Sequence, residues 1–129
     1  MLQAGRPLQR IAQALAGLVD EGPPPILSET SSLNQRAEAL RALRERRCRL
    51  ILSTPLGSRG LVVSHCSHVY LFDVPTTPDA YLHAAGRCGR NGLPGRVTVL
   101  GSDKEAFVIQ RIANTLGIEF EDARRPDWK

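Results

Sequence analysis

The hydrophobic positions of the chain predict helices and strands in alternation. The first pattern has the period of a helix face and consists of Leu8, Ile11, Leu15, Leu18 and Val19. Pro7 suits the first turn of this helix, and Gly22 followed by the prolines at 23–25 ends it. The apolar residues within 26–29 then predict a short strand.

The middle of the chain predicts a second helix and three longer strands. Asn34 is placed to cap this helix, whose apolar stripe consists of Ala37, Leu40 and Leu43. Buried strands are predicted at 48–54, 68–74 and 96–100. The run at 68–74 is continuously apolar, which is typical of a parallel strand buried on both faces.

Two more helices complete the prediction. One begins near Asp79, with Thr77 or Pro78 at its start. The last helix lies within 102–117, and its ends are marked by Ser102, Glu105 and Gly117. Strands that alternate with helices indicate an α/β fold, an open parallel sheet with helices on both faces.

Composition and charge narrow the class of protein. The chain has 129 residues, which fits one domain, and no apolar run long enough to span a bilayer, so no membrane partner is expected. Three scattered cysteines predict reduced thiols inside a cell, in cytoplasm, nucleus or organelle. Arg6 and Arg10 are compatible with an organellar targeting helix, but Asp20 and Glu21 argue against one.

The basic residues are unevenly distributed. The formal net charge is +4, and arginine is concentrated at 41–49 and 86–96, which favours a polyanionic partner. After the strand at 48–54, the loop of Thr54 and residues 55–60 combines a hydroxyl, two glycines and Arg59. Such a loop at the carboxyl end of a parallel strand suits a phosphate. A helix-capping loop with a solvated arginine is an alternative interpretation of the same sequence.

The second basic segment has a more informative spacing. Arg87 and Arg90 are three residues apart and can project to the same side, while Gly86 and Gly89 allow a partner surface to approach. An arginine aimed into a cleft can stabilise a transferring phosphoryl group. The alternative is a solvated basic turn.

These segments resemble motifs of the DEAD-box RNA helicases. HAAGRCGR at 83–90 resembles their HRxGRxGR motif, and STPLGSRGL at 53–61 resembles their (S/A)TDxxxRGxD motif. Gln35 is similarly placed to the glutamine of a QxxR element, and 72–87 resembles YDxP followed by the HRxGR helix. The four segments occur in the family's order.

The resemblance implies the C-terminal RecA-like lobe of such a helicase over residues 1–116. The first strand of the lobe is absent or reduced to residues 1–5. Residues 117–129 are expected to form a tail that crosses the surface, with Trp128 as a candidate anchor. In that family the lobe clamps the backbone of single-stranded RNA and sends two arginines to ATP. The implied RNA-binding residues are Thr54, Arg59, Gly60 and Gln35, and the implied ATP-sensing arginines are Arg87 and Arg90. ATP with Mg would be a cofactor only beside the family's other lobe.

Several motif positions depart from the family's pattern. Ala84 stands for the first arginine of HRxGRxGR, Val62 for the aspartate that meets the ATP ribose, Pro55 for the aspartate after the threonine, and Glu38 for the arginine of QxxR. The sequence also contains no GxxxxGK[ST] phosphate loop and no DEAD motif. We therefore expect that this chain does not hydrolyse ATP alone.

Three functions stay open at this point. The favoured one is a non-catalytic RNA-binding component of a ribonucleoprotein, with protein partners. The second is lobe two of an active ATP-dependent RNA helicase whose other RecA-like lobe lies outside this chain, and the third is an unrelated α/β nucleotide binder. A metal site is not expected, because the spacing of His65, Cys66, His68 and Cys88 fits no structural zinc pattern.

Overall fold

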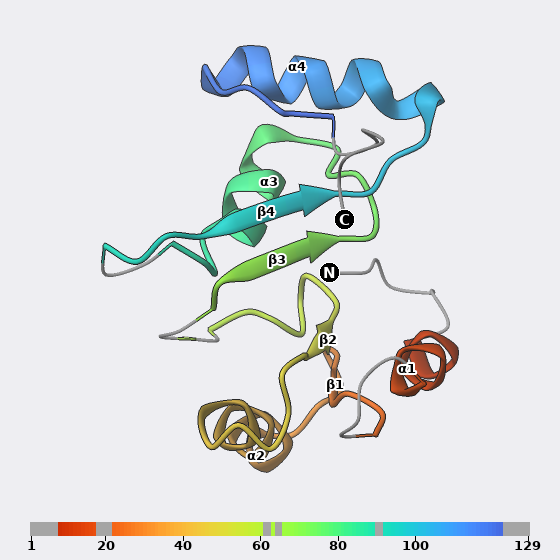
Figure 1. Ribbon diagram of the computed structural model, residues 1–129, viewed down its shortest axis with the longest axis vertical. Coiled ribbons are helices and arrows are strands. Elements are labelled where there is room, and N and C mark those ends of the chain that lie inside the picture. The colour runs from red at the N-terminus through yellow and green to blue at the C-terminus, as the bar shows by residue number, and fades with distance from the viewer. Residues whose placement is uncertain (1–7, 18–21, 61–62, 64–65, 90–91, 123–129) are drawn as a thin grey trace.

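The computed structural model describes residues 8–17, 22–60, 63, 66–89 and 92–122 (Figure 1). Its helices are α1 (Leu8–Ala16), α2 (Leu33–Arg44), α3 (Pro78–Ala85) and α4 (Ala106–Leu116), the last preceded by the 3-10 turn η1 (Asp103–Glu105). Its strands are β1 (Ile26–Leu27), β2 (Leu52–Ser53), β3 (His68–Leu71) and β4 (Arg96–Val99). Predictions about Pro7, Leu18, Val19 and Trp128 fall outside the described residues.

The strands pair in parallel, as predicted for an α/β fold. β1 pairs with β2, where Ile26 lies opposite Leu52, and β3 pairs with β4, where Val69 lies opposite Val97. The described strands thus make two two-stranded sheets. No helix in the described part of the chain is long and apolar enough to cross a membrane.

Helices cover both faces of the β1–β2 pair, with α1 and α2 on opposite sides of it in Figure 1. Successive side chains of a strand point to opposite faces. Accordingly, Ile26 packs with α1 in a cluster around Leu8 and Ala12, whereas Leu27 packs with Ala39 of α2.

The β3–β4 pair has one covered face. Val69 and Leu71 are buried in a cluster with Tyr81 of α3 and Ile112 of α4. On the other face Tyr70 is 43% exposed, and Phe72, just past the strand, is 37% exposed. The prediction that 68–74 is buried on both faces is therefore wrong, because within the described residues both α3 and α4 pack on the same side.

The start of α2 differs from the prediction. Ser32, not Asn34, caps the helix: its hydroxyl accepts from the Gln35 N–H at 3.1 Å, and Gln35 Oε1 accepts from the Ser32 N–H at 2.8 Å. This reciprocal pair is a capping box. The buried residues of α2 are Ala39 and Ala42, whereas Ala37 of the predicted stripe is exposed.

The ends of α3 and α4 agree with the prediction. Thr77 caps α3, since its hydroxyl accepts from the Ala80 N–H at 3.1 Å. The Ser102 N–H donates to the Glu105 carboxylate at 2.8 Å, and Gly117 closes α4 in the left-handed conformation with φ 67°. Beyond α4, Phe120 meets the Tyr81 ring edge-on at 5.5 Å between centroids. The boundary at 116 stays a prediction.

Candidate nucleic-acid interface

The segment after β2, residues 54–60, forms a tight loop that we call the β2 loop. Thr54 is only 3% exposed, and its hydroxyl donates to Glu29 Oε2 and accepts from the Gly57 N–H, both at 2.9 Å. Glu29 follows β1 and is exposed. Its own backbone N–H and the Thr54 hydroxyl hold the pKa of this carboxyl below its usual value. Thr54 therefore shapes the loop from inside and joins it to an ionised carboxylate.

Arg36 fastens the β2 loop to the end of β1. Its Nη1 donates to the carbonyl of Gly57, its Nη2 to the carbonyl of Ser28 at 3.1 Å, and its Nε to the carbonyl of Ser31 at 3.4 Å. Sequence reasoning missed this residue. The signal available was weak, because an arginine early in a helix is usually solvated.

Gly57 lets the loop lie against β1. A Cβ at this position would come within 2.7 Å of the Leu27 carbonyl carbon and 2.8 Å of Ser28 Cα, both backbone atoms. No side chain fits there without moving one of the two segments. The glycine is thus a packing requirement of the loop.

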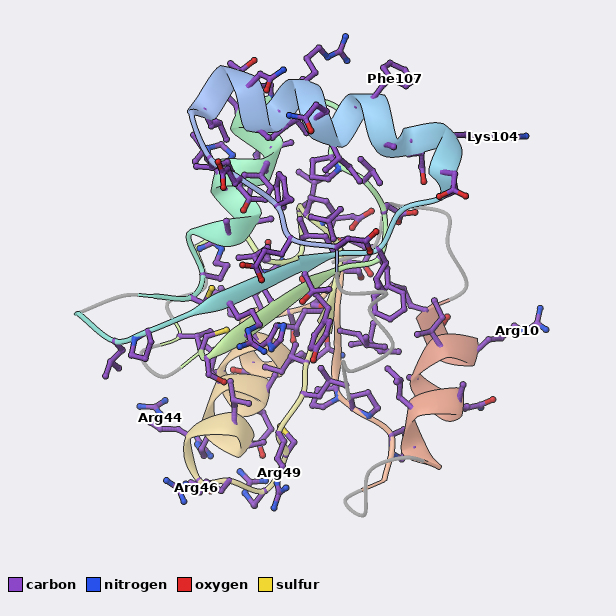
Figure 2. All side chains as sticks on the ribbon, turned by 45° about the horizontal axis from the view of Figure 1, so that its top comes forward. Arg10, Arg44, Arg46, Arg49, Lys104 and Phe107 are labelled. Carbon is purple, nitrogen blue, oxygen red and sulfur yellow. The ribbon has the colours of Figure 1, made fainter. Side chains whose placement is uncertain are left out.

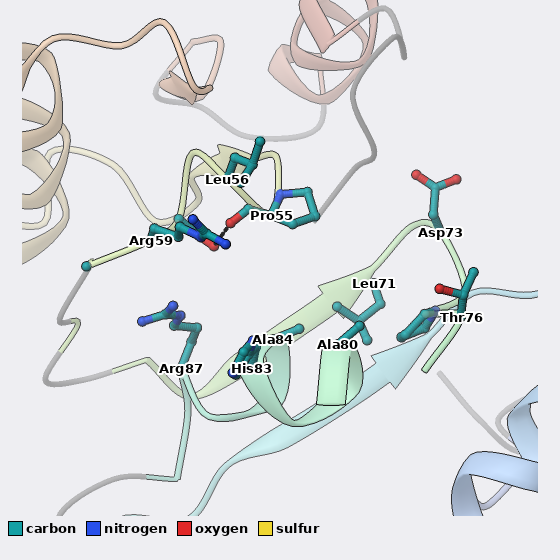
Figure 3. A pocket seen from close by; sticks show the side chains of 13 residues that line it. Pro55, Leu56, Arg59, Leu71, Asp73, Thr76, Ala80, His83, Ala84 and Arg87 are labelled. Carbon is teal, nitrogen blue, oxygen red and sulfur yellow. Dashed lines mark hydrogen bonds between the residues drawn. The ribbon is translucent and has the colours of Figure 1, made fainter. Parts of the chain in front are cut away.

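The β2 loop and α3 enclose an open cleft of about 520 Å³. Figure 3 shows Arg59 approaching it from the β2 loop and Arg87 from the end of α3. Arg59 is exposed and Arg87 is half-buried, with its Nε atom fully buried. Other residues that line the cleft and bear on its chemistry are Ser58, Gly60, Asp73 and Ala84. Two guanidinium groups from distant segments therefore share one cavity.

The predicted site residues separate into three groups. Arg59, Gly60 and Arg87 line the cleft, while Thr54 supports it from within. Gln35 lies at the start of α2, where its amide takes part in the helix cap. Arg90 lies outside the described residues.

The motif positions that depart from the family's pattern have structural roles of their own. Ala84 is 6% exposed and packs in the cluster beneath α3. The Pro55 carbonyl accepts from the Ser58 hydroxyl at 2.9 Å. Glu38 forms ion pairs with Arg41 and Arg47 at 3.4 and 3.0 Å. Val62 lies outside the described residues.

The cysteines and histidines near β3 make local contacts. The Cys66 thiol donates to the His68 carbonyl at 3.4 Å, and the Cys88 thiol donates to the Ala85 carbonyl at 3.5 Å. Burial raises the pKa of both thiols, which keeps them protonated at neutral pH. The described residues contain no group of three or more His, Cys, Asp or Glu that could hold a metal ion, and His65 lies outside them.

Comparison with known proteins finds similar segments within larger chains. The ATP-dependent rRNA helicase RRP3 of Encephalitozoon cuniculi is 38% identical over 91 residues, which are 70% of this chain and 23% of that protein. DEAD-box ATP-dependent RNA helicase 58, chloroplastic, of Oryza sativa subsp. japonica is 38% identical over 100 residues, which are 75% of this chain and 23% of that protein. This chain therefore spans about a quarter of the length of these relatives.

The structural alignment and the match to a family model both indicate the C-terminal lobe of a helicase. The crystal structure of the E. coli DEAD-box protein SrmB, bound to regulator of ribonuclease activity A, aligns with a TM-score of 0.80 at 23% identity, over 99% of this chain and 76% of that one. The model of the helicase conserved C-terminal domain matches residues 24–92, a segment that includes the β2 loop, α3 and the cleft between them. The chain belongs to this helicase C-terminal domain family and has the RecA-like C-terminal lobe of the DEAD-box RNA helicases.

Proposed function

We propose that this chain binds the backbone of single-stranded RNA in the cleft between the β2 loop and α3. The observation that carries the proposal is the position of Arg59 and Arg87, which approach one cleft from two segments (Figure 3). Guanidinium groups bind phosphate oxygens through paired N–H donors. Both relatives described above are named as RNA helicases, which supports RNA as the molecule whose phosphates bind here.

Within this proposal Arg59 and Gly60 are the direct contacts. Arg59 is exposed, and Gly60 has φ 73° with no atom within 4 Å of the place where a Cβ would lie, so a ligand can approach its backbone. Thr54 acts as a positioning residue for the loop, since its hydroxyl bonds with Glu29 and Gly57. Gln35 is a weaker candidate contact.

ATP with Mg fits this chain only in part. The cleft offers Arg87 as a group that can meet a phosphate, and Arg90 follows three residues later. The sequence has no phosphate loop and no DEAD motif, which in this family supply the cradle for the phosphates and the metal. We therefore propose that Arg87 and Arg90 contact ATP when a second RecA-like lobe is present, and not in this chain alone. ATP bound between the two lobes would supply the energy of the family's cycle.

We favour a non-catalytic RNA-binding component of a ribonucleoprotein over lobe two of an active helicase. Three motif positions support this choice: Ala84 and Pro55 have no charge where the family's pattern has a charged residue, and Glu38 has the opposite charge. The apolar clusters of the fold are present at the same time. An active enzyme would need the missing polar groups from another chain or segment.

The experiment is binding of the purified chain to fluorescent oligouridine of about 10 nucleotides, across salt concentrations from about 0.05 to 0.5 M. We expect salt-sensitive binding that does not change with an ATP analogue. Arg59→Ala should weaken it similarly for all base sequences, because phosphate contacts carry no base information. The slope of log K against log salt should shrink by about 0.7 for each lost phosphate contact.

Arg10→Ala is the matched control, since Arg10 is an exposed arginine on α1. It should leave binding unchanged apart from the small effect of net charge. If Arg59→Ala bound RNA as tightly as Arg10→Ala does, the cleft would not be the RNA site. If adding the ATP-binding lobe of a relative produced RNA-stimulated ATP hydrolysis that Arg87→Ala abolishes, the helicase alternative would replace the favoured one.

A further inference from the structure

The basic segment at the end of α2 is not used by the cleft. Arg44, Arg46 and Arg49 are exposed, and Figure 2 shows their side chains projecting outward from the end of α2 and the turn after it. We call these three residues the α2-end patch. None of them lines the cleft between the β2 loop and α3.

The acidic residues nearby neutralise other arginines. Glu38 pairs with Arg41 and Arg47, and Glu45 pairs with Arg47 at 2.9 Å. Within the described part of the chain, no ion pair includes Arg44 or Arg46. Arg44 and Arg46 therefore present positive charge that the surrounding carboxylates do not pair with.

Arg46 occupies a backbone position that favours glycine. The Arg47 N–H donates to the Ala42 carbonyl at 2.8 Å and the Arg46 N–H to the Leu43 carbonyl at 3.2 Å, which is the hydrogen-bond pattern of a Schellman motif. Arg46 is its left-handed residue, with φ 59°, the one described non-glycine residue with positive φ. A side chain with a Cβ costs stability in this conformation. An exposed arginine at such a strained position is a reason to propose a role for its guanidinium.

The charge at the helix end is explained only in part by the helix dipole. A cation in the last turn is stabilised by the partial negative charge of the C-terminus, which accounts for Arg44. That effect falls off within the last turn. Arg46 directly follows the cap residue Glu45, so the dipole favours its charge but does not account for its left-handed backbone. Arg49 lies farther along the chain, and the dipole does not account for its charge.

We propose that the α2-end patch is a second contact for an RNA phosphate backbone. Segment 41–50 contains no aromatic residue, and its apolar side chains Ala42, Leu43, Cys48 and Leu50 are buried or half-buried. A protein interface is usually centred on apolar or aromatic anchors, which the patch lacks, whereas a row of phosphates needs only charge and N–H donors. The choice of RNA rests on the proposed function, but the two sites can fail separately.

The geometry of α2 connects the two sites. Arg36 holds the first turn of α2 against the β2 loop, and the patch lies at the other end of this 12-residue helix. At 1.5 Å per residue, the separation along the helix is about 18 Å. An RNA that fills the cleft and continues along α2 can therefore reach the patch, while one that only fills the cleft does not contact both.

The test compares fluorescent oligouridines of about 5 and about 25 nucleotides on the whole chain, over the same salt series. The variant is Arg44→Gln with Arg46→Gly, and its matched control, which removes the same charge elsewhere, is Arg10→Gln with Lys104→Gln. Figure 2 shows Arg10 and Lys104 away from the patch. We expect the patch variant to weaken binding of the long RNA and to reduce its salt slope by about 1.4, which is about 0.7 for each arginine, with short-RNA affinity unchanged.

Arg46→Gly alone provides a check on folding. Because glycine relieves the left-handed strain, it should leave the melting temperature equal or higher while the affinity for the long RNA falls. A decrease in affinity therefore cannot be attributed to unfolding.

The outcomes distinguish the two proposals. If Arg59→Ala weakens binding of both RNAs while the patch variant binds them as tightly as its control, the patch proposal is overturned and the cleft proposal stands. If only the patch variant weakens binding, the patch stands and the cleft proposal fails. If the patch variant loses binding to polyglutamate but not to RNA, the partner is an acidic protein and the RNA assignment is wrong.

Discussion

Arg36 and Gly57, which are 21 residues apart in the sequence, are joined by a hydrogen bond from the guanidinium Nη1 to the glycine carbonyl. The same guanidinium reaches the carbonyl of Ser28 at the end of β1. One side chain of α2 thus connects the two segments that follow adjacent parallel strands. The shape of the β2 loop, and with it the position of Arg59, depends on this connection.

We predict that Arg36→Ala lowers the free energy of unfolding by about 2–3 kcal/mol, because half-buried carbonyls lose a charged donor. RNA affinity should fall as well, since the β2 loop loses its support. Urea unfolding and the oligouridine assay measure the two effects. Arg41→Ala, on the exposed side of the same helix, should change stability by less than about 1 kcal/mol because its pair with Glu38 is solvated. Equal effects of the two variants would contradict the role given to Arg36.

Gly57→Ala should open the contact between the β2 loop and β1. The new Cβ would lie 2.7 Å from the Leu27 carbonyl carbon, so backbone must move, and we expect a loss of about 1–3 kcal/mol in the free energy of unfolding. Gly17→Ala is the control, since its Cβ would make only an ordinary contact at 3.7 Å with the Ala14 carbonyl. If thermal unfolding of Gly57→Ala matched that of Gly17→Ala, the close packing of the loop would be refuted.

Sequence reasoning predicted best the features that depend on near neighbours. The start of α3 follows from Thr77 and Pro78, and the stop of α4 from Gly117, because a cap is made within a few residues of the helix end. The start of α2 was misplaced although the signal was present. Ser32 stands three residues before Gln35 and closes a capping box, whereas Asn34 would have Ala37 at the corresponding position.

Features that depend on tertiary contacts could not be predicted in the same way. The apolar run at 68–74 does not reveal that α3 and α4 pack on one side of β3–β4, leaving Tyr70 exposed. Arg59 follows the carboxyl end of β2, where ligands gather in parallel sheets, but Arg87 follows α3 and precedes β4, so this rule does not predict that the two arginines share a cleft. Nothing in the local sequence around Arg36 indicates its contact with a loop 21 residues away.

Glu29→Gln should increase RNA affinity. The Glu29 carboxylate accepts a hydrogen bond from the Thr54 hydroxyl at 2.9 Å and places a negative charge next to the β2 loop, which carries Arg59. Because its pKa is lowered, it is ionised throughout the neutral range. Glutamine keeps an acceptor oxygen and removes the charge, so the loop should keep its shape while repulsion decreases. Titration with oligouridine measures the gain, and Glu119→Gln, an exposed carboxylate after α4, should show less of it. Equal gains would attribute the effect to net charge alone.

His68 should make stability depend on pH. Burial, with a smaller contribution from the charge of Arg96, lowers the pKa of this imidazole, whose Nε2 is hydrogen-bonded with the Thr98 hydroxyl at 2.8 Å. The unfolded chain has the usual histidine pKa of about 6.5. Between that value and the lower pKa of the folded state, the unfolded chain binds more protons. Stability should therefore decrease as the pH falls below about 6.5.

The measurement is urea unfolding of the wild type and of His68→Gln at a series of pH values from about 7.5 down to about 5. Glutamine can keep a hydrogen bond to Thr98 and does not titrate, so the variant should lose less stability on acidification than the wild type. Glu29 adds a separate loss of stability only at more acidic pH. Because its pKa is lowered in the folded chain, its contribution is complete at a pH above the usual carboxyl pKa and is lost as the pH falls towards the lowered one. Parallel stability curves for the two proteins across this range would mean that His68 is protonated as readily in the folded chain as in the unfolded one.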